Sequence, residues 1–307
     1  MSGMDTPDVI LPSCCQLCPR RCGADRAHGH RGVCGAADEL RLARAALHFW
    51  EEPPISGDAG SGTVFFSNCP LHCVYCQNAR IANGTCGADV SVSRLAAIFL
   101  EQQARGALNL NLVTGTHYVP QILAALHMAR SAGCSLPVVW NSSGYETPET
   151  IALLADVVDL WLVDLRYSRC ATAQVLSCAP DYPQVAREAL LAMAQTPGEM
   201  IVRVLGIPGY LEDAAENLLW LWHNLGPKRA TLSLMGQYTP VPRVADDPNL
   251  GRPLSPEEYE ELLDFADEVG FDGYFWQEGG AAQESFIPDF DALEGVEGPE
   301  LEELANL

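Results

Sequence analysis

The chain has 307 residues, of which 48% are hydrophobic and 19% charged, a composition typical of a soluble globular protein with a sizeable core. The formal net charge of −22 argues against a nucleic-acid partner, because binding to phosphates needs a basic face. The sequence has no apolar run of about eighteen residues and no signal-peptide pattern, so we expect no membrane partner. Twelve cysteines in such a chain are typical of metal ligands rather than disulfides, which predicts a reducing, cytoplasmic environment.

A cysteine-rich segment with ligand-like spacing lies near the N-terminus. Four thiols suit a structural Zn²⁺ or a second iron–sulfur cluster, and free thiols in a loop are the alternative. The segment has too few apolar residues to fold without a metal or a neighbouring domain. We therefore assign residues 1–60 to a metal-binding segment and a connector, which is extended over 48–57 because paired prolines disfavour a helix. The four thiols are Cys15, Cys18, Cys22 and Cys34.

A second cysteine motif directly follows an apolar run at 62–67, which predicts a buried strand. Cys69, Cys73 and Cys76 lie within eight residues, and three thiolates in one tight loop can hold three corners of a cubane iron–sulfur cluster. No further cysteine follows at the spacing of a fourth ligand, so one iron would stay open to a substrate. The alternatives are a zinc loop completed by His72 or Cys86, or three thiols in the core.

From residue 61 to residue 285, strand-like runs alternate with amphipathic stretches, the rhythm of a parallel sheet. Six strand–helix units are too few for an eight-fold barrel, so we predict an α/β fold with a partial (βα)6 parallel barrel. Ligand-binding residues should then lie at the carboxyl ends of the strands. The predicted strands are 62–67, 108–114, 136–141, 157–164, 200–205, 230–235 and 273–276, the helices are 91–105, 119–132, 148–155, 182–195, 212–225 and 256–269, and 39–47 is a strand or a short helix.

Both ends of the chain carry a strong charge bias. Six arginines lie between residues 14 and 50, whereas residues 246–307 hold 19 acidic residues against one basic residue. We expect residues 286–307 to form an acidic C-terminal tail, which is either mobile or a short helix that docks on the basic N-terminal segment.

Small and charged residues follow the predicted strands at the edge where a ligand would bind. Glycines and small side chains let a backbone approach a ligand, while arginine and aspartate supply fixed charge. This mixture suits an amino acid joined to a ribose and an adenine, and a local cap or ion pair is the alternative for any one residue. The candidate residues are Thr114, Gly115, Asn141, Ser142, Ser143, Asp164, Arg166, Arg203 and Gln237.

The cysteine loop, with Tyr75 before its last thiol, and these strand ends together resemble the radical S-adenosylmethionine (SAM) superfamily. The branch is similar to pyruvate formate-lyase activating enzyme, and the N-terminal CxLCPRxCG segment resembles an uncharacterised activating-enzyme-like subgroup. The resemblance implies a [4Fe-4S] cluster on Cys69, Cys73 and Cys76, and SAM at the strand ends. It implies that the backbone of Thr114 and Gly115 faces the SAM ammonium, that Ser142 and Ser143 lie near the ribose, and that Arg203 binds the carboxylate.

The chain departs from the family pattern at four places. No glutamate follows Gly115, which weakens the contact with the ammonium. Asn141 replaces an acidic residue, which removes one carboxylate from a monovalent-cation site that Asp164 would keep. Arg166 stands where the activases have a lysine, and Gln237 stands where a histidine contacts adenine.

We therefore predict an oxidoreductase that cleaves SAM at the cluster with an electron from flavodoxin or ferredoxin, and whose 5′-deoxyadenosyl radical abstracts hydrogen from a substrate. The resemblance implies a glycine of a glycyl radical enzyme as that substrate. Radical modification of another protein, a peptide or a small metabolite is the alternative. A hypothesis of a different class is a non-enzymatic iron–sulfur electron carrier or scaffold, which leaves the open three-cysteine loop unexplained.

Overall fold

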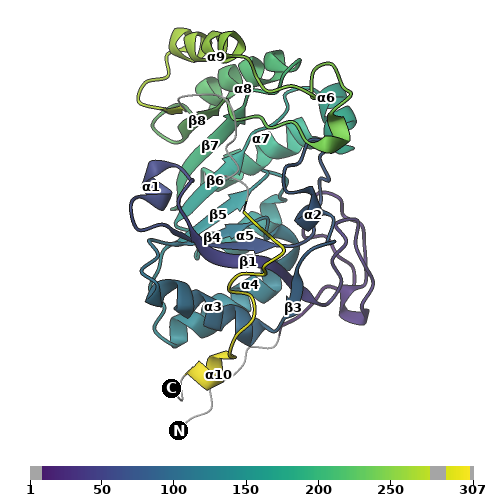
Figure 1. The fold of residues 1–307 in the computed structure, drawn as a ribbon, viewed down its shortest axis with the longest axis vertical. Coiled ribbons are helices and arrows are strands. Elements are labelled where there is room, and N and C mark those ends of the chain that lie inside the picture. Colours follow the sequence, from purple (N-terminus) through teal and green to yellow (C-terminus); the bar gives the residue numbers. More distant parts are fainter. Residues whose placement is uncertain (1–8, 277–287, 305–307) are drawn as a thin grey trace. The chain divides into compact units, whose positions relative to one another are not determined.

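The computed structural model describes residues 9–276 and 288–304. Within these residues the fold is α/β, with a nine-stranded, mostly parallel sheet in the order β3-β1-β2-β4-β5-β6-β7-β8-β9 (Figure 1). The chain forms two compact units, each described here by itself. The first unit comprises Met1–Pro70, Arg80–Asn141 and Asp289–Leu307, and the second comprises Leu71–Ala79 and Ser142–Pro288. None of the described helices is long and apolar enough to cross a lipid bilayer.

The first unit is built on a mixed group of strands. β1 (Leu40–His48) pairs in antiparallel fashion with β2 (Ser61–Phe66) and, through its first residues, with β3 (Ala88–Val90). β2 pairs in parallel with β4 (Leu110–Val113), which pairs in parallel with β5 (Val138–Ser142). All six residues of β2 are buried, as expected for a strand that is covered on both faces.

The structure resolves one open prediction here and corrects another. Residues 39–47 belong to a strand rather than a helix, because all but the first of them lie in β1, which pairs with a strand on each side. The prediction of an extended connector over 48–57 is wrong, since α1 (Pro53–Ser56) is a short helix. Its prolines occupy the first helical positions, where an amide N–H would have no intrahelical acceptor and is not missed.

Two longer helices, α3 (Val92–Ala104) and α4 (Val119–Ser131), pack against each other in the first unit. Ser91 caps α3, because its Oγ accepts the Arg94 N–H at 2.8 Å. The remaining short elements of this unit are η1 (Arg26–His28), α2 (Ala79–Ala82), η2 (Thr116–Tyr118) and α10 (Leu301–Leu304).

The second unit continues the alternation of strands and helices. β6 (Leu160–Asp164) pairs in parallel with β7 (Glu199–Leu205), β7 with β8 (Thr231–Met235), and β8 with β9 (Phe275–Trp276). The predicted series of six strand–helix units followed by a short strand is confirmed in the described residues. The helices are α5 (Pro148–Leu154), α6 (Cys170–Ser177), α7 (Tyr182–Met193), α8 (Leu211–Asn224), η3 (Pro242–Val244) and α9 (Pro256–Val269).

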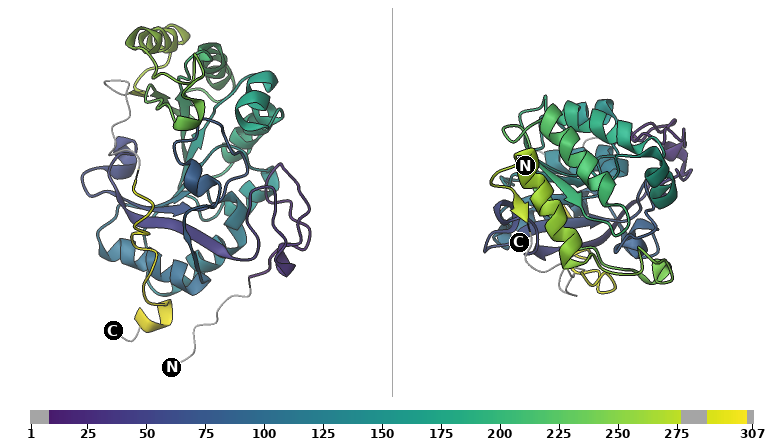
Figure 2. Two further views of the ribbon diagram at one scale, coloured as in Figure 1. Left: turned by 45° about the vertical axis from the view of Figure 1, so that its right-hand side comes forward. Right: turned by 90° about the horizontal axis from the view of Figure 1, so that it is seen from above.

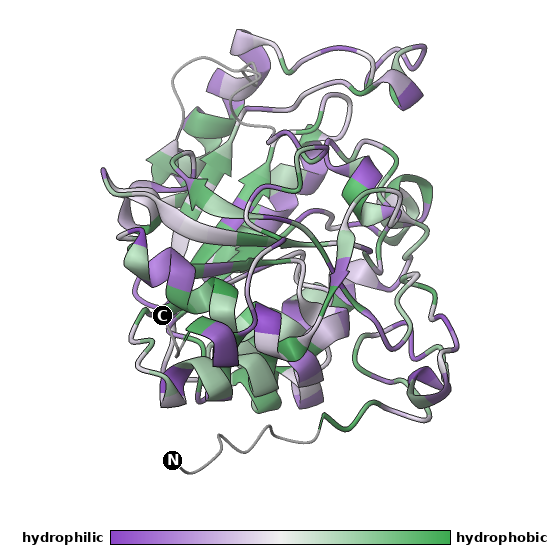
Figure 3. Cartoon of the chain, turned by 60° about the horizontal axis from the view of Figure 1, so that its bottom comes forward, coloured by the Kyte–Doolittle hydropathy of each residue, from purple (hydrophilic) through white to green (hydrophobic). Residues whose placement is uncertain are grey.

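Local sequence signals explain where two of these helices begin. Thr147 accepts the Thr150 N–H at the start of α5, and Ser255 forms a capping box at the start of α9. α6 was not predicted, because no side chain caps its first turn and its eight residues form no long apolar stripe. Hydrophobic residues concentrate in the strands and on the helix faces that pack against them (Figure 3).

The C-terminal segment is part of the first unit and lies along β1. Ala45 donates its N–H to Glu294 O at 2.8 Å, and the Phe290 ring meets the Phe65 ring at 5.3 Å between centroids. Arg44 of the basic N-terminal region pairs with Glu294. Figures 1 and 2 show this segment in yellow, running past β1 to α10. Over the described residues it is therefore a docked segment that ends in a short helix.

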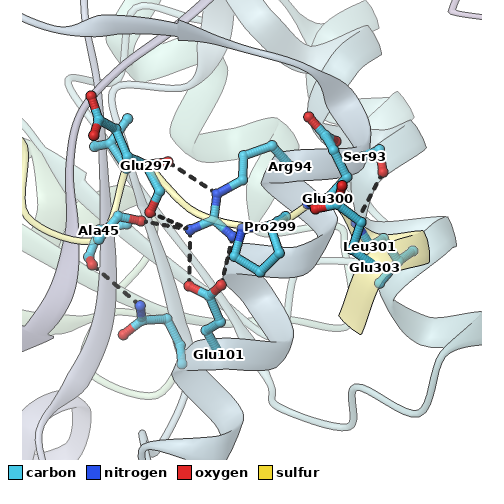
Figure 4. A network of polar contacts seen from close by, with 12 residues as sticks. Ala45, Ser93, Arg94, Glu101, Glu297, Pro299, Glu300, Leu301 and Glu303 are labelled. Carbon is cyan, nitrogen blue, oxygen red and sulfur yellow. Dashed lines mark hydrogen bonds and ion pairs between the residues drawn. The ribbon is translucent and has the colours of Figure 1, made fainter. Parts of the chain in front are cut away.

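One buried guanidinium holds this segment. Arg94 Nε donates to Val296 O at 3.0 Å, and its two terminal nitrogens donate to the carbonyls of Pro299, Gly295 and Glu297 at 2.9–3.1 Å (Figure 4). The same guanidinium forms a two-point ion pair with Glu101 of its own helix. Four backbone carbonyls within residues 295–299 thus depend on one side chain that is 5% exposed.

We expect Arg94→Met to lower the free energy of unfolding by about 3–5 kcal/mol, because it leaves the Glu101 carboxylate and four backbone carbonyls without their hydrogen-bond donor. Urea denaturation measures this loss, and limited proteolysis should show faster cleavage within 289–304. Arg80→Met is the matched control, since Arg80 pairs with Asp291 of the same segment but both side chains are more than half exposed. Its unfolding midpoint should stay unchanged, and equal losses in the two variants would contradict the role given to Arg94.

Candidate functional site

The loop at residues 71–79 in the second unit ties Cys73 to helix α6. Val74 donates its N–H to Leu176 O at 2.9 Å, and Cys76 donates its N–H to Cys73 O at 3.2 Å. His72 adopts a left-handed conformation, with φ of 54°, and turns the chain into this loop. Cys73 is buried and Cys76 is half-buried. The backbone of α6 therefore fixes where the Cys73 sulfur lies.

Polar hydrogens surround the Cys73 sulfur. Ser177 Oγ lies 2.9 Å from Sγ, Arg166 Nη1 lies 3.1 Å away, and Tyr167 Oη lies at 3.8 Å. Donors at these distances stabilise a thiolate, whereas a neutral buried thiol gains little from them. The surroundings of Cys73 thus suit the thiolate, which is the form in which cysteine binds a metal.

Arg166 joins this sulfur to a carboxylate, because its Nη2 pairs with Asp164 Oδ2 at 2.6 Å. Burial disfavours the charged guanidinium, but the Cys73 sulfur and the Asp164 carboxylate outweigh it and raise the pKa of Arg166 well above its usual value. Burial also raises the pKa values of Tyr75 and Tyr167. Both phenols keep their protons at physiological pH and so remain hydrogen-bond donors.

The structure brings part of the predicted strand-end set of the second unit together. Asp164, at the end of β6, stands opposite Arg203 of β7 in the strand register. Ser142 Oγ accepts the Gly144 N–H at 3.2 Å and donates to Glu146 at 3.1 Å. The Ser142 hydroxyl therefore closes a local turn, and its predicted place near a ribose stays a prediction.

Tyr182 links the segments that follow β5 and β6. Its hydroxyl accepts the Arg166 N–H at 3.0 Å and lies 2.8 Å from both Ser143 O and Asp164 O. Gln237, the predicted adenine contact, lies half-buried just beyond β8. The roles of Ser143 and Gln237 toward a cofactor stay predictions.

In the first unit, the predicted residues Thr114 and Asn141 are neighbours. Thr114 donates its N–H to Asn141 O at 2.9 Å and turns the chain after β4 with a left-handed φ of 60°. The Asn141 amide donates to Glu51 Oε1 at 3.3 Å, and the same oxygen accepts a hydrogen bond from Asn111 at 2.9 Å. Glu51 was absent from the predicted set, because it lies on the connector that precedes the predicted parallel strands.

Gly115 has a packing role that the sequence did not reveal. A Cβ at this position would lie 2.7 Å from Ile122 Cδ1 and 2.9 Å from the Trp140 ring. The glycine is therefore required for η2 to pack closely on α4 and β5, whether or not its backbone also faces a ligand.

Tight turns organise the N-terminal cysteine segment. Cys15 donates its N–H to Ala24 O and accepts the Gly23 N–H, both at 3.0 Å, so these residues form a narrow hairpin. Arg21 donates its N–H to Cys18 O at 3.0 Å and closes a second turn with a left-handed φ of 38°. Tight turns of this kind are compatible with the metal-binding segment that the spacing predicts.

The sulfurs of this segment lie near one another. A Cβ on Gly32 would lie 3.2 Å from Cys22 Sγ and 3.4 Å from Cys34 Sγ, so the glycine leaves room for both. Within residues 9–276 and 288–304, no group of three or more cysteine, histidine or carboxylate side chains has a geometry that could hold a metal ion. The metal ligands at both cysteine motifs therefore stay predictions.

Three of these thiols, those of Cys18, Cys22 and Cys34, differ in acidity. Burial raises the pKa of Cys18 to about 12 and also raises the pKa of Cys34. Burial by itself would raise the pKa of Cys22 as well. The backbone N–H groups of Ala24 and Val33 outweigh this effect and hold the pKa of Cys22 below its usual value. Cys22 is thus the most acidic of these three thiols.

The N-terminal segment is bonded directly to the start of the second cysteine motif. Cys69 donates its N–H to Cys34 O at 3.3 Å, and Arg20 Nε donates to Pro70 O at 2.9 Å. A fully buried arginine, Arg26, supports the same region: its Nε donates to Ala37 O at 2.6 Å and its Nη1 to the His117 carbonyl.

Comparisons with known proteins bear on the region around the second cysteine motif. Residues 55–179 match the family model of a 4Fe-4S single cluster domain. This match contains Cys69, Cys73 and Cys76 and supports an iron–sulfur cofactor. An uncharacterized protein of Methanocaldococcus jannaschii is 29% identical over 266 residues, which cover 84% of this chain and 75% of that protein.

A solved structure is also similar to part of this chain. The crystal structure of Streptococcus suis SuiB bound to precursor peptide SuiA superposes with a TM-score of 0.48 at 12% identity. The similarity covers 69% of this chain and 46% of that chain, so this chain spans less than half of the SuiB length.

Ser177 and Tyr167 are the functional candidates that the sequence missed. Tyr167 directly follows Arg166 after β6, so its place at a strand end was a usable signal. Ser177 gave none, because it ends an unpredicted helix 104 residues from the cysteine whose sulfur it contacts.

In the metal-free protein, we expect iodoacetamide to alkylate Cys22 at least about tenfold faster than Cys18 at pH 7.5, because the thiolate is the nucleophile. A lowered pKa keeps the Cys22 thiolate populated to lower pH than an ordinary thiol, whereas Cys18 should react only at high pH. Mass spectrometry of the labelled peptides measures both rates. Equal rates for Cys18 and Cys22 would contradict the assignment.

Proposed function

We propose that the chain is a radical SAM enzyme whose [4Fe-4S] cluster is held by Cys69, Cys73 and Cys76. The match of residues 55–179 to a 4Fe-4S single cluster domain carries this proposal, since it contains all three thiols. The spacing supports it too, because the motif leaves one iron without a protein ligand.

The residues around Cys73 fit such a cofactor. Its sulfur faces the guanidinium of Arg166 and the hydroxyl of Ser177, both of which favour negative charge on sulfur. Cysteine in a cluster is a thiolate, and the reduced cluster carries more negative charge than the oxidised one. A structural thiol in the core would find these donors of little use.

The remaining roles belong to the strand ends. In this proposal Arg203 binds the SAM carboxylate, the backbone at Thr114 and Gly115 accepts from its ammonium, and Ser142, Ser143 and Gln237 lie along the nucleoside. Asn141 and Asp164 border the same ligand, and Arg166 lends its charge to the cluster side. When bound, the cluster and SAM would supply a 5′-deoxyadenosyl radical that abstracts hydrogen from the substrate. The protein contributes orientation and exclusion of water.

The substrate we propose is a glycine of a glycyl radical enzyme, on the sequence resemblance to the activating enzymes. The replacements at Asn141, Arg166 and Gln237 make another protein, a peptide or a small metabolite the alternative substrate. Flavodoxin or ferredoxin is the proposed electron donor, and the cytoplasm the proposed compartment. Incubation with a candidate glycyl radical enzyme, followed by electron paramagnetic resonance (EPR) for a glycyl radical, separates these substrate classes.

We also propose that Cys15, Cys18, Cys22 and Cys34 hold a second metal centre, either Zn²⁺ or an iron–sulfur cluster. Four thiols in tight turns support it. The backbone hydrogen bond from Cys69 N–H to Cys34 O supports it too, because through this bond the centre would brace the cluster loop. Metal analysis of a Cys18→Ala variant should show one centre fewer than the wild type.

After anaerobic reconstitution with iron and sulfide, we expect dithionite and SAM to yield 5′-deoxyadenosine, measured by chromatography. Cys73→Ala should reduce this product to background, because it removes a cluster ligand. Cys170→Ala is the matched control, since Cys170 is an exposed thiol at the start of α6 and should leave iron content and product unchanged. A wild-type protein that binds iron and sulfide but never cleaves SAM would instead favour an electron carrier or scaffold.

A further inference from the structure

A chain of three hydroxyl groups ends on the Cys73 sulfur. Tyr75 Oη lies 2.9 Å from Tyr167 Oη, Tyr167 Oη lies 2.6 Å from Ser177 Oγ, and Ser177 Oγ lies 2.9 Å from Cys73 Sγ. Nothing in the sequence marks these residues as a group, since Tyr75, Tyr167 and Ser177 come from a loop, a strand end and a helix end.

The sulfur determines the direction of this chain. Each hydroxyl has one hydrogen to donate, and a thiolate can only accept. Once Ser177 donates to Cys73, its oxygen is left to accept from Tyr167, and the Tyr167 oxygen then accepts from Tyr75. The direct contact of Tyr167 with the sulfur, at 3.8 Å, is too long to compete with the 2.6 Å contact to Ser177. All three hydrogen bonds therefore point toward Cys73.

We propose that this hydroxyl chain, Tyr75 to Tyr167 to Ser177, raises the reduction potential of the iron–sulfur cluster bound through Cys73. The inference rests on the proposed function, because it needs the cluster. Ser177 is a positioning and tuning residue in this scheme, since it touches a ligand atom and no substrate.

The physical reason is the charge that the cluster gains. One-electron reduction adds one negative charge, part of which resides on the ligand sulfurs, so a donor to sulfur stabilises the reduced form more than the oxidised form. Bonds in a directed chain polarise one another, which makes the last donor stronger than an isolated serine. The hydroxyl chain is also buried, because Tyr75, Tyr167 and Ser177 are each at most 7% exposed. Water therefore cannot replace a donor that a substitution removes.

Substitution of Ser177 tests this effect more directly than substitution of Arg166. The guanidinium also pairs with Asp164, so removing it changes two charged contacts at once. Replacing Ser177 with alanine removes a single neutral donor and no charge. Tyr167→Phe keeps Ser177 in place and removes the phenol that polarises it, together with the bond to Tyr75 and the longer contact with the sulfur.

The test is an EPR-monitored redox titration of the reconstituted protein with dithionite as reductant. At a fixed potential near the wild-type midpoint, we expect Ser177→Ala to lower the ratio of reduced to oxidised cluster by about three- to tenfold. Tyr167→Phe should lower the ratio in the same direction by a smaller factor. Ser177→Thr keeps the hydroxyl and should restore the wild-type ratio.

Two matched controls make the same chemical changes away from the sulfur. Ser168→Ala removes a hydroxyl that contacts Asp213 and Glu216, and Tyr145→Phe removes a phenol that contacts Asp181. Both should leave the ratio unchanged. These controls separate an effect on the cluster from a general loss of packing.

The outcomes distinguish the two levels of the proposal. If the wild type takes up no iron–sulfur cluster, the proposed function fails. If it does, and Ser177→Ala and Tyr167→Phe titrate like the wild type, the cluster stands and the hydroxyl chain is overturned. If Ser177→Ala cannot hold a cluster, Tyr167→Phe alone decides, and an unchanged ratio in that variant overturns the inference.

Discussion

Buried and half-buried guanidinium groups organise this protein. An arginine removed from water carries a charge and five N–H donors, and leaving them unpaired costs several kcal/mol. Arg94, Arg26 and the half-buried Arg166 each donate to acceptors that lie far away in the sequence or on another element: four carbonyls near residue 297, the carbonyls of Ala37 and His117, and the sulfur of Cys73. In each case the cation determines which segments of a unit lie together.

The three guanidinium charges are stabilised in different ways. Arg94 and Arg166 each have a carboxylate partner, so their charge is balanced within the protein. Arg26 relies on carbonyl dipoles and the face of the Tyr118 ring, and one of its terminal nitrogens has no acceptor among the described residues. Its charge lowers the pKa of the nearby Cys34 thiol, although burial of that thiol has the larger, opposite effect. The cysteine segment thus packs around a cation that favours negative sulfur.

Local signals in the sequence were enough to predict the repeating body. Ser91, Thr147 and Ser255 cap helices because their hydroxyls satisfy the first free N–H groups, an interaction within four residues that any reader of the sequence can see. The strand ends were predictable for a similar reason, since apolar runs stop where polar residues begin. Asp164 and Arg203 were both among the predicted residues, and the parallel pairing of β6 with β7 places them opposite each other.

The features that escaped prediction depend on distant partners. The contact of Ser177 with Cys73 spans 104 residues, and the carbonyls bound by Arg94 carry no side-chain signature at all. The packing role of Gly115 also depends on distant partners, because the side chains of Ile122 and Trp140 leave no room for a Cβ there. The prolines of α1 misled because their effect depends on whether they begin a helix or interrupt one.

The docking of Glu294 on Ala45 has a consequence for how the chain is made. The first unit takes its strands from the early part of the sequence, but the residues that pair with the free edge of β1 are synthesised much later. Until they emerge from the ribosome, β1 presents an unpaired edge, the kind of surface to which other strands attach. Completion of the first unit therefore waits until the segment that carries Glu294 has been synthesised, well after the strands of that unit.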